Sequence, residues 1–131
     1  MVIDSSALLA IILDEPERVA FVDAIEADTE RLISAVNVFE SSIVLEARNG
    51  TDSVDDLDQL LTRIGADVRS FGNADLDVAR RAFRIYGKGR HPAGLNFGDC
   101  IAYALAKNTG NALLYKGDDF VRTDIALAVV A

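Results

Sequence analysis

The stretch Met1-Val2-Ile3-Asp4-Ser5-Ser6 decides the fold class that we assign to this chain. Its apolar start is typical of a short buried strand, and this strand would end in the carboxylate of Asp4. In open α/β sheets, ligands bind outside the carboxyl ends of the strands. Asp4 therefore occupies a position where a functional acid is expected, and it would also suit the N-cap of a short helix over 5–12.

Short apolar runs alternate with longer amphipathic stretches along the rest of the chain. We expect strands at 1–5, 32–33, 66–71, 112–115 and 125–130, the last at an edge, and helices at about 14–27, 36–48, 52–64, 73–86 and 97–108. In the helix over 73–86, Leu76, Ala79 and Phe83 should face inward and the arginines outward. This alternation predicts an α/β domain with a parallel sheet, and the length predicts one domain over residues 1–131.

Composition excludes several classes of protein. Half of the residues are hydrophobic, so an intrinsically disordered chain is not expected. No apolar run approaches the roughly 20 residues of a membrane helix, and the first residues do not resemble a secretory signal. Cys100 is the single cysteine, which excludes an internal disulfide and fits a reducing compartment. We therefore expect a cytoplasmic protein without a membrane segment.

The formal charge of −8 disfavours nucleic-acid binding at first sight, because phosphate contacts need lysine and arginine. The bases are concentrated, however, in one segment next to His91. This segment is either a solvated helix face or a local surface for anions such as RNA. Its members are Arg80, Arg81, Arg84, Lys88 and Arg90.

Further acids lie in or beside apolar stretches far apart in the sequence. Glu40 lies within the apolar stretch 36–45, Asp99 begins the stretch 99–106, and Asp118 and Asp119 follow the run 112–115. Glutamate is rarely buried without a partner, whereas an aspartate in a first helical turn or in a turn also has a purely structural explanation. If these acids meet Asp4, their mutual repulsion requires a cation.

Such a site favours Mg²⁺, with Mn²⁺ as the alternative, because only carboxylate oxygens are available in number. Any of these carboxylates that does not bind the metal would position or deprotonate a water molecule. Ser6 and Asn96 are candidate supporting polar groups, and Lys116 would offset negative charge or contact a phosphate. Cys100 is expected to be a small core residue rather than a nucleophile.

Four pieces of the sequence resemble the PIN-domain nucleases, and specifically the VapC-type ribonuclease toxins of type II toxin–antitoxin systems. They are Val2-Ile3-Asp4-Ser5-Ser6-Ala7-Leu8, Glu40 in its helix, Asn96-Phe97-Gly98-Asp99-Cys100-Ile101-Ala102-Tyr103-Ala104, and Lys116-Gly117-Asp118-Asp119-Phe120. The resemblance covers essentially the whole chain.

The resemblance implies a three-layer α/β/α sandwich around a small parallel sheet, and Mg²⁺- or Mn²⁺-dependent endonucleolytic cleavage of RNA, usually tRNA or ribosomal RNA. It makes Asp4, Glu40 and Asp99 the core catalytic acids, with Asp4 and Asp99 as the expected direct metal ligands. The fourth acid is ambiguous, because the family's commoner loop has an aspartate where this chain has Gly117; we favour Asp118 over Asp119. It also implies a homodimer and an antitoxin partner, for which the helices near 8–27 and 36–64 offer apolar surfaces.

Two other functions compete with the nuclease. A phosphatase or receiver-like α/β domain also gathers acids at strand ends, but it would need a second aspartate soon after the first strand, and Asp4 is followed by Ser5 and Ser6. The remaining alternative is a non-enzymatic interaction module with an inert acidic pocket.

Overall fold

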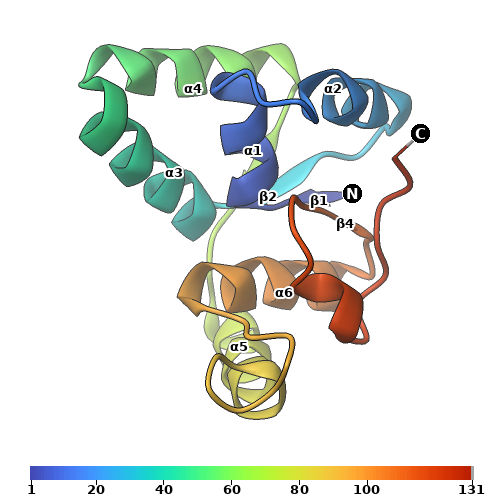
Figure 1. Ribbon diagram of the computed structural model, residues 1–131. Helices are drawn as coiled ribbons and strands as arrows, with labels where there is room; N and C mark the ends of the chain where they lie inside the picture. Colours follow the sequence, from blue (N-terminus) through green and yellow to red (C-terminus); the bar gives the residue numbers. More distant parts are fainter. Residues whose placement is uncertain (131) are drawn as a thin grey trace.

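A computed structural model describes residues 1–130, and in this range a small parallel sheet lies between two layers of helices (Figure 1). The strands are β1 (Val2–Ile3), β2 (Leu32–Ser34), β3 (Asp67–Arg69) and β4 (Leu113–Leu114). Their order is β3-β2-β1-β4, and all three pairings are parallel. The predicted α/β/α architecture is confirmed, and β1 lies inside the sheet with its carboxyl end between those of β2 and β4.

Helices lie above and below the sheet in the view of Figure 1. The upper helices are α1 (Ser5–Ile12), α2 (Arg18–Ala27), α3 (Ala35–Asn49) and α4 (Asp52–Arg63). The lower helices are α5 (Asn73–Tyr86) and α6 (Phe97–Thr109). A short 3-10 helix, η1 (Phe120–Arg122), follows β4. No helix within residues 1–130 is both long enough and apolar enough to cross a bilayer.

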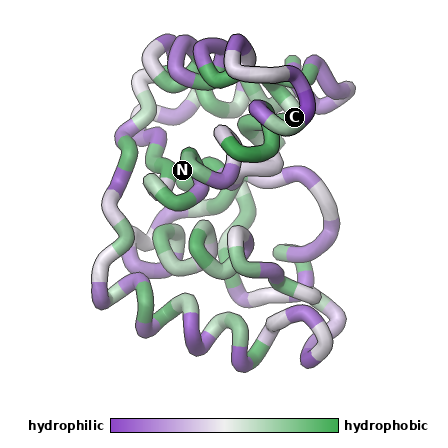
Figure 2. Tube along the Cα trace, turned by 90° about the vertical axis from the view of Figure 1, so that its left-hand side faces the viewer, coloured by the Kyte–Doolittle hydropathy of each residue, from purple (hydrophilic) through white to green (hydrophobic). Residues whose placement is uncertain are grey.

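Successive strand residues point to opposite faces of the sheet and thereby divide the core into two clusters. Val2 and Leu113 pack in the cluster around α5 and α6, whereas Ile3 and Leu114 pack in the cluster around α1, α2 and α4. In Figure 2 hydrophobic stretches recur between the layers, and the outer helices alternate hydrophobic and hydrophilic residues. β1, β2 and β4 are buried on both faces, as expected for a parallel sheet, whereas the edge strand β3 is exposed.

Arg31 ties the ends of two helices to the start of β2. Its guanidinium donates to the carbonyl oxygens of Ile25 at 2.9 Å, Asp28 at 3.0 Å and Glu26 at 3.3 Å, all near the end of α2. It also donates to the carbonyl of Ile64 at 2.8 Å, after α4. One planar side chain therefore satisfies carbonyl groups that the helix ends leave unpaired.

Two expectations about the fold are wrong. Residues 125–130 do not form an edge strand: β4 is only two residues long, and the last segment meets it in a single bridge between Leu113 and Leu127. In α5, Ala79 is buried as expected, but Leu76 and Phe83 are 43% and 41% exposed, because no further layer covers their side of the helix.

Replacing Arg31 by lysine should lower the free energy of unfolding by about 2 kcal/mol, because one ammonium cannot reproduce the four hydrogen bonds of the planar group. Urea denaturation followed by circular dichroism would measure the change. The matched control is Arg48→Lys, since Arg48 is exposed in the last turn of α3. Equal stability of the two variants would contradict this role of Arg31.

Candidate active site

Asp4 immediately follows β1 and caps α1. Its backbone N–H donates to the carbonyl of Leu114 at 2.9 Å, which continues the pairing with β4. Its Oδ2 accepts hydrogen bonds from the backbone N–H of Ser6 at 3.1 Å and from the Ser6 hydroxyl at 2.5 Å. Asp4 is only 3% exposed. Asp4 is therefore both a helix cap and an acid at the end of a strand, and the two expectations for this residue are compatible.

Asp99 is held at the start of α6 by a reciprocal pair of hydrogen bonds with Asn96. The backbone N–H of Asp99 donates to Asn96 Oδ1 at 2.9 Å, and the backbone N–H of Asn96 donates to Asp99 Oδ2 at 3.0 Å. This capping box explains both polar residues locally. It also fixes a largely buried carboxyl group, 9% exposed, at a helix N-terminus that favours negative charge.

Glu40 reaches from α3 to the start of α6 and lies in a polar cradle. Its Oε1 accepts hydrogen bonds from the Ser5 hydroxyl and, at 3.3 Å, from the side-chain amide of Asn37. The same amide donates to the carbonyl of Gly98 at 3.1 Å. A β-carbon at residue 98 would overlap the Glu40 carboxylate, so this approach requires glycine.

Ser5, Asn37 and Gly98 were not singled out from the sequence as site residues. Asn37 is completely buried and its side-chain oxygen has no hydrogen-bond partner among the described residues. The position of Asn37 could have identified it, because side chains three positions apart lie on the same face of a helix and Asn37 is three positions before Glu40.

The loop after β4 carries Asp118 and Asp119, and of the two it is Asp119 whose charge acts on Asp99. Burial raises the pKa of Asp99 first, and the negative charge of Asp119 raises it further. Asp118 instead lies nearer Tyr115, whose pKa rises through burial first and then through the charges of Asp118 and Asp119. The effect of its charge on Asp99 favours Asp119 as the fourth acid, and the choice between Asp118 and Asp119 stays a prediction.

Burial and mutual repulsion raise the proton affinity of the cluster. Burial raises the pKa of Asp4 to about 6, with a further contribution from the charge of Glu40 and against the hydrogen bonds from Ser6. Burial likewise raises the pKa of Asp99 to about 7, and the charges of Asp4 and Asp119 add to the effect. These four acids therefore interact electrostatically as one group.

The donor chemistry of the cluster fits a hard divalent cation. Within residues 1–130 no three acidic, histidine or cysteine side chains are already arranged as a complete set of metal ligands. Over the same range, Asp4, Glu40 and Asp99 form no ion pair with lysine or arginine. Buried carboxylates without a counter-charge are costly, so Asp4 and Asp99, completed by water, are suited to hold Mg²⁺ or Mn²⁺.

The Ser6 side chain contacts the acid cluster, whereas the Lys116 side chain pairs with other acids. The Ser6 hydroxyl donates to Asp4 and accepts from the backbone N–H of Lys116 at 2.9 Å, so it joins β1 to the loop after β4. The Lys116 ammonium pairs with Glu15 and, at 3.3 Å, with Glu17. The expectation that Lys116 offsets the charge of the acids or contacts a phosphate therefore finds no support in its contacts.

Cys100 is a buried core residue, as expected. Its side chain is 5% exposed. Burial raises the pKa of the thiol to about 11, and the nearby charge of Asp99 adds to this shift. A thiol in this state is a poor nucleophile.

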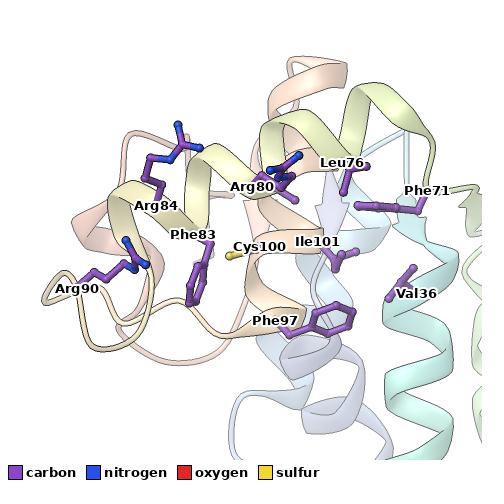
Figure 3. A pocket seen from close by; sticks show the side chains of 11 residues that line it. Val36, Phe71, Leu76, Arg80, Phe83, Arg84, Arg90, Phe97, Cys100 and Ile101 are labelled. Atoms are coloured by element: carbon purple, nitrogen blue, oxygen red, sulfur yellow. The ribbon is translucent and has the colours of Figure 1, made fainter.

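The basic segment divides between two surfaces. Three of its residues line a groove of about 570 Å³ between α5 and α6, shown in Figure 3. They are Arg80, Arg84 and Arg90. Arg81 lines a second hollow with Asp77, which Arg80 and Arg84 also line, and Lys88 is exposed on the loop after α5. The groove and the acid cluster share α6, since Phe97 and Cys100 line the groove on either side of Gly98 and Asp99.

Comparison with known proteins agrees with the fold. The PIN domain family matches residues 1–126. "VapC ribonuclease Mb0640" of Mycobacterium bovis is 50% identical over 126 residues, 96% of each chain. "Ribonuclease VapC" of Mycolicibacterium smegmatis is 46% identical over 126 residues, covering 96% of this chain and 98% of the relative.

Solved structures show the same fold at low identity. VapC20 of Mycobacterium tuberculosis superposes with a TM-score of 0.77 at 13% identity, covering 99% of this chain and 98% of that one. VapBC2 of Rickettsia felis, bound to a promoter DNA fragment, gives 0.75 at 14% identity and covers 96% and 94%. On the family match and the identity to its relatives, this chain belongs to the PIN-domain family, among the VapC ribonucleases.

Proposed function

We propose that this protein is a divalent-metal-dependent endoribonuclease, and that it acts as the toxin of a toxin–antitoxin pair. The observation that carries the proposal is the meeting of Asp4, Glu40, Asp99 and Asp119 from four distant segments without a cationic partner. Relatives at 50% and 46% identity are described as VapC ribonucleases, which supports the same activity here.

Asp4 and Asp99 would hold the metal, with Mg²⁺ as the expected ion and Mn²⁺ as the alternative. A bound cation supplies Lewis-acid chemistry and neutralises charge that develops on a phosphodiester. The hydrogen bonds of Ser6 and Asn96 fix the two aspartates. Glu40, oriented by Ser5 and Asn37, is placed to accept a proton from water, and Asp119 is the second candidate for this role.

The substrate would be RNA, with tRNA or ribosomal RNA as the expected class. VapC20, a structural neighbour, is described as a toxin that cleaves the sarcin–ricin loop. The exposed bases along α5 and the following loop offer the positive surface that a polyanion needs on a chain of net charge −8. Arg80, Arg84 and Arg90 line the groove that shares α6 with the acids, and Arg81 and Lys88 would contact phosphates outside it.

The regulatory partner would be a cognate antitoxin, and the toxin itself would be a homodimer. The neighbour from Rickettsia felis is described as VapBC2, and another from Klebsiella pneumoniae as a toxin–antitoxin complex. An antitoxin segment carrying arginine would pair with the acid cluster through charge-assisted hydrogen bonds. The apolar surfaces of α1, α2, α3 and α4 are the candidate docking sites.

Asp4→Asn and Asp99→Asn should each lower the rate of RNA cleavage at least about 100-fold, because each removes a proposed metal ligand. The measurement is cleavage of a labelled RNA in Mg²⁺ or Mn²⁺, with EDTA as the blank and circular dichroism to check folding. Asp58→Asn, at an exposed position of α4, is the control. A folded wild-type protein that leaves total cellular RNA intact under all these conditions would refute the nuclease and favour an inert acidic pocket.

Without metal, the free energy of unfolding should fall as the pH rises from about 4 to about 7, because the folded state holds the protons of Asp4 and Asp99 more tightly than the unfolded chain does. Asp99→Asn should therefore stabilise the metal-free protein at pH 8 by on the order of 2 kcal/mol. Thermal unfolding in EDTA and in Mg²⁺ would test both points. Mg²⁺ should raise the melting temperature of the wild type more than that of the variant, and equal shifts would contradict metal binding at Asp99.

Gly98→Ala should lower cleavage roughly 10- to 100-fold, because the added methyl group displaces the Glu40 carboxylate from its cradle. The metal-dependent shift in melting temperature should persist, since Asp4 and Asp99 remain. Gly72→Ala is the matched control, because a β-carbon there meets no atom within 4 Å. Undiminished cleavage by Gly98→Ala would show that the position of Glu40 does not matter to the reaction.

A further inference from the structure

Lys116 connects the loop after β4 to the segment between α1 and α2. Its backbone N–H donates to the Ser6 hydroxyl at 2.9 Å, in the first turn of α1. Its ammonium pairs with Glu15 and, at 3.3 Å, with Glu17, both beyond the last turn of the same helix. The lysine side chain therefore extends along α1, and it is held at both of its ends.

The segment that supplies the two carboxylates has a defined backbone conformation. Asp14 has a φ of 54°, in the left-handed region that residues other than glycine seldom adopt. The backbone N–H of Glu15 donates to the carbonyl of Ala10 in α1 at 2.9 Å. The carbonyl of Glu17 accepts from the backbone N–H of Phe21 in α2 at 2.9 Å. The two glutamates are thus fixed by one helix on each side.

The ion pairs of Lys116 with Glu15 and Glu17 form a clamp between these two parts of the chain. Glu17 Oε2 is inaccessible to solvent and has no hydrogen-bond partner among residues 1–130, so the ammonium is the group that neutralises it. The hydrogen bond to Glu15 raises the pKa of Lys116, which keeps the ammonium charged. A single exposed pair stabilises a protein little, but without the ammonium these two carboxylates would repel each other.

The loop that follows Lys116 has few other restraints. Gly117 has a φ of 113°, so the chain turns immediately after the lysine. Among the described residues 1–130, Gly117 and Asp118 take part in no hydrogen bond. Phe120, which is 1% exposed, anchors the other end of the loop in the core. The positions of Asp118 and Asp119 therefore depend on Lys116 at one end and on Phe120 at the other.

We propose that Lys116 is a positioning residue for the cleavage reaction, because its clamp fixes the loop that carries Asp118 and Asp119 beside the acid cluster. The inference rests on the proposed ribonuclease function. Ser6, which accepts from the backbone N–H of Lys116, also donates to Asp4 at 2.5 Å, so the lysine is connected to the first acid as well as to the loop. This role differs from a phosphate contact, since the ammonium is already bound by two carboxylates.

Two variants break the clamp from opposite sides. Lys116→Met removes the ammonium, and Glu15→Gln/Glu17→Gln removes both carboxylates that bind it. Steady-state cleavage of a labelled RNA in Mg²⁺ should show a roughly tenfold lower kcat for each, with KM little changed, because a displaced acid slows the reaction without weakening substrate binding. Combining all three substitutions should add little to either defect, since they remove the same interaction.

A second readout does not depend on catalysis. In EDTA, hydrogen exchange of the backbone N–H at position 116 should be faster in both variants than in the wild type, because the hydrogen bond to Ser6 opens more often. Lys116→Arg should restore most of kcat and slow the exchange again, because a guanidinium also binds carboxylates through paired hydrogen bonds. Lys107→Met is the matched control, since Lys107 pairs with Asp124 at 2.6 Å outside this loop, and it should change neither readout.

Circular dichroism would check that each variant folds, and if Lys116→Met does not, the glutamine variant decides by the same measurements. A wild-type kcat in folded variants would overturn the positioning role and spare the ribonuclease. A higher KM and a weaker salt dependence of RNA binding in Lys116→Met, with wild-type behaviour of Glu15→Gln/Glu17→Gln, would instead make Lys116 a direct phosphate contact. A wild type that does not cleave RNA would refute the ribonuclease itself, and this role with it.

Discussion

The main constraint on the active site is the repulsion between carboxylates, which the fold brings together at the carboxyl end of its sheet. Asp4 is buried at the end of the central strand, and Asp99 is buried at the start of α6, so neither charge is well solvated. Burial first, and this repulsion second, raise the pKa of Asp4 to about 6 and that of Asp99 to about 7. A cation relieves the repulsion, because it replaces several unfavourable pairs by favourable ones at once.

The remaining site residues serve to hold these groups in place despite their repulsion. Ser6 links Asp4 to the loop after β4, and Asn96 fastens Asp99 to the first turn of α6. Asn37 bridges Glu40 and the backbone of Gly98. Each acid is thus oriented by a neutral partner, which leaves its charge available for a ligand.

Much of the fold was predictable because its signals are local. The helices over 73–86 and 52–64 were each located to within one residue, since periodicity and glycine punctuation mark them. The order of the strands was not predicted, because it depends on how distant segments pack. The exposure of Leu76 and Phe83 was missed for a related reason: an amphipathic pattern identifies an apolar face but not whether another layer covers it.

The site residues likewise fall into those that the sequence could identify and those that depend on tertiary contacts. Asp4, Glu40 and Asp99 could be selected from their positions beside apolar stretches and from the family motif. The choice between Asp118 and Asp119 depends on how one loop turns, and the pairing of Lys116 with Glu15 and Glu17 depends on residues about a hundred positions away in the chain. Neither follows from residue type and spacing, because each is decided by tertiary contacts.

The capping box at the start of α6 has a consequence for how sequence can vary here. Gly98 makes room for Glu40, but glycine is a poor helix former and weakens the turn in which it lies. The bonds between Asn96 and Asp99 offset this weakness. Asp99 thus helps to start the helix on which it lies. Amino-acid substitution at this position is therefore constrained twice, by folding and by chemistry. A lineage that lost the reaction would still be under selection to keep a capping residue there.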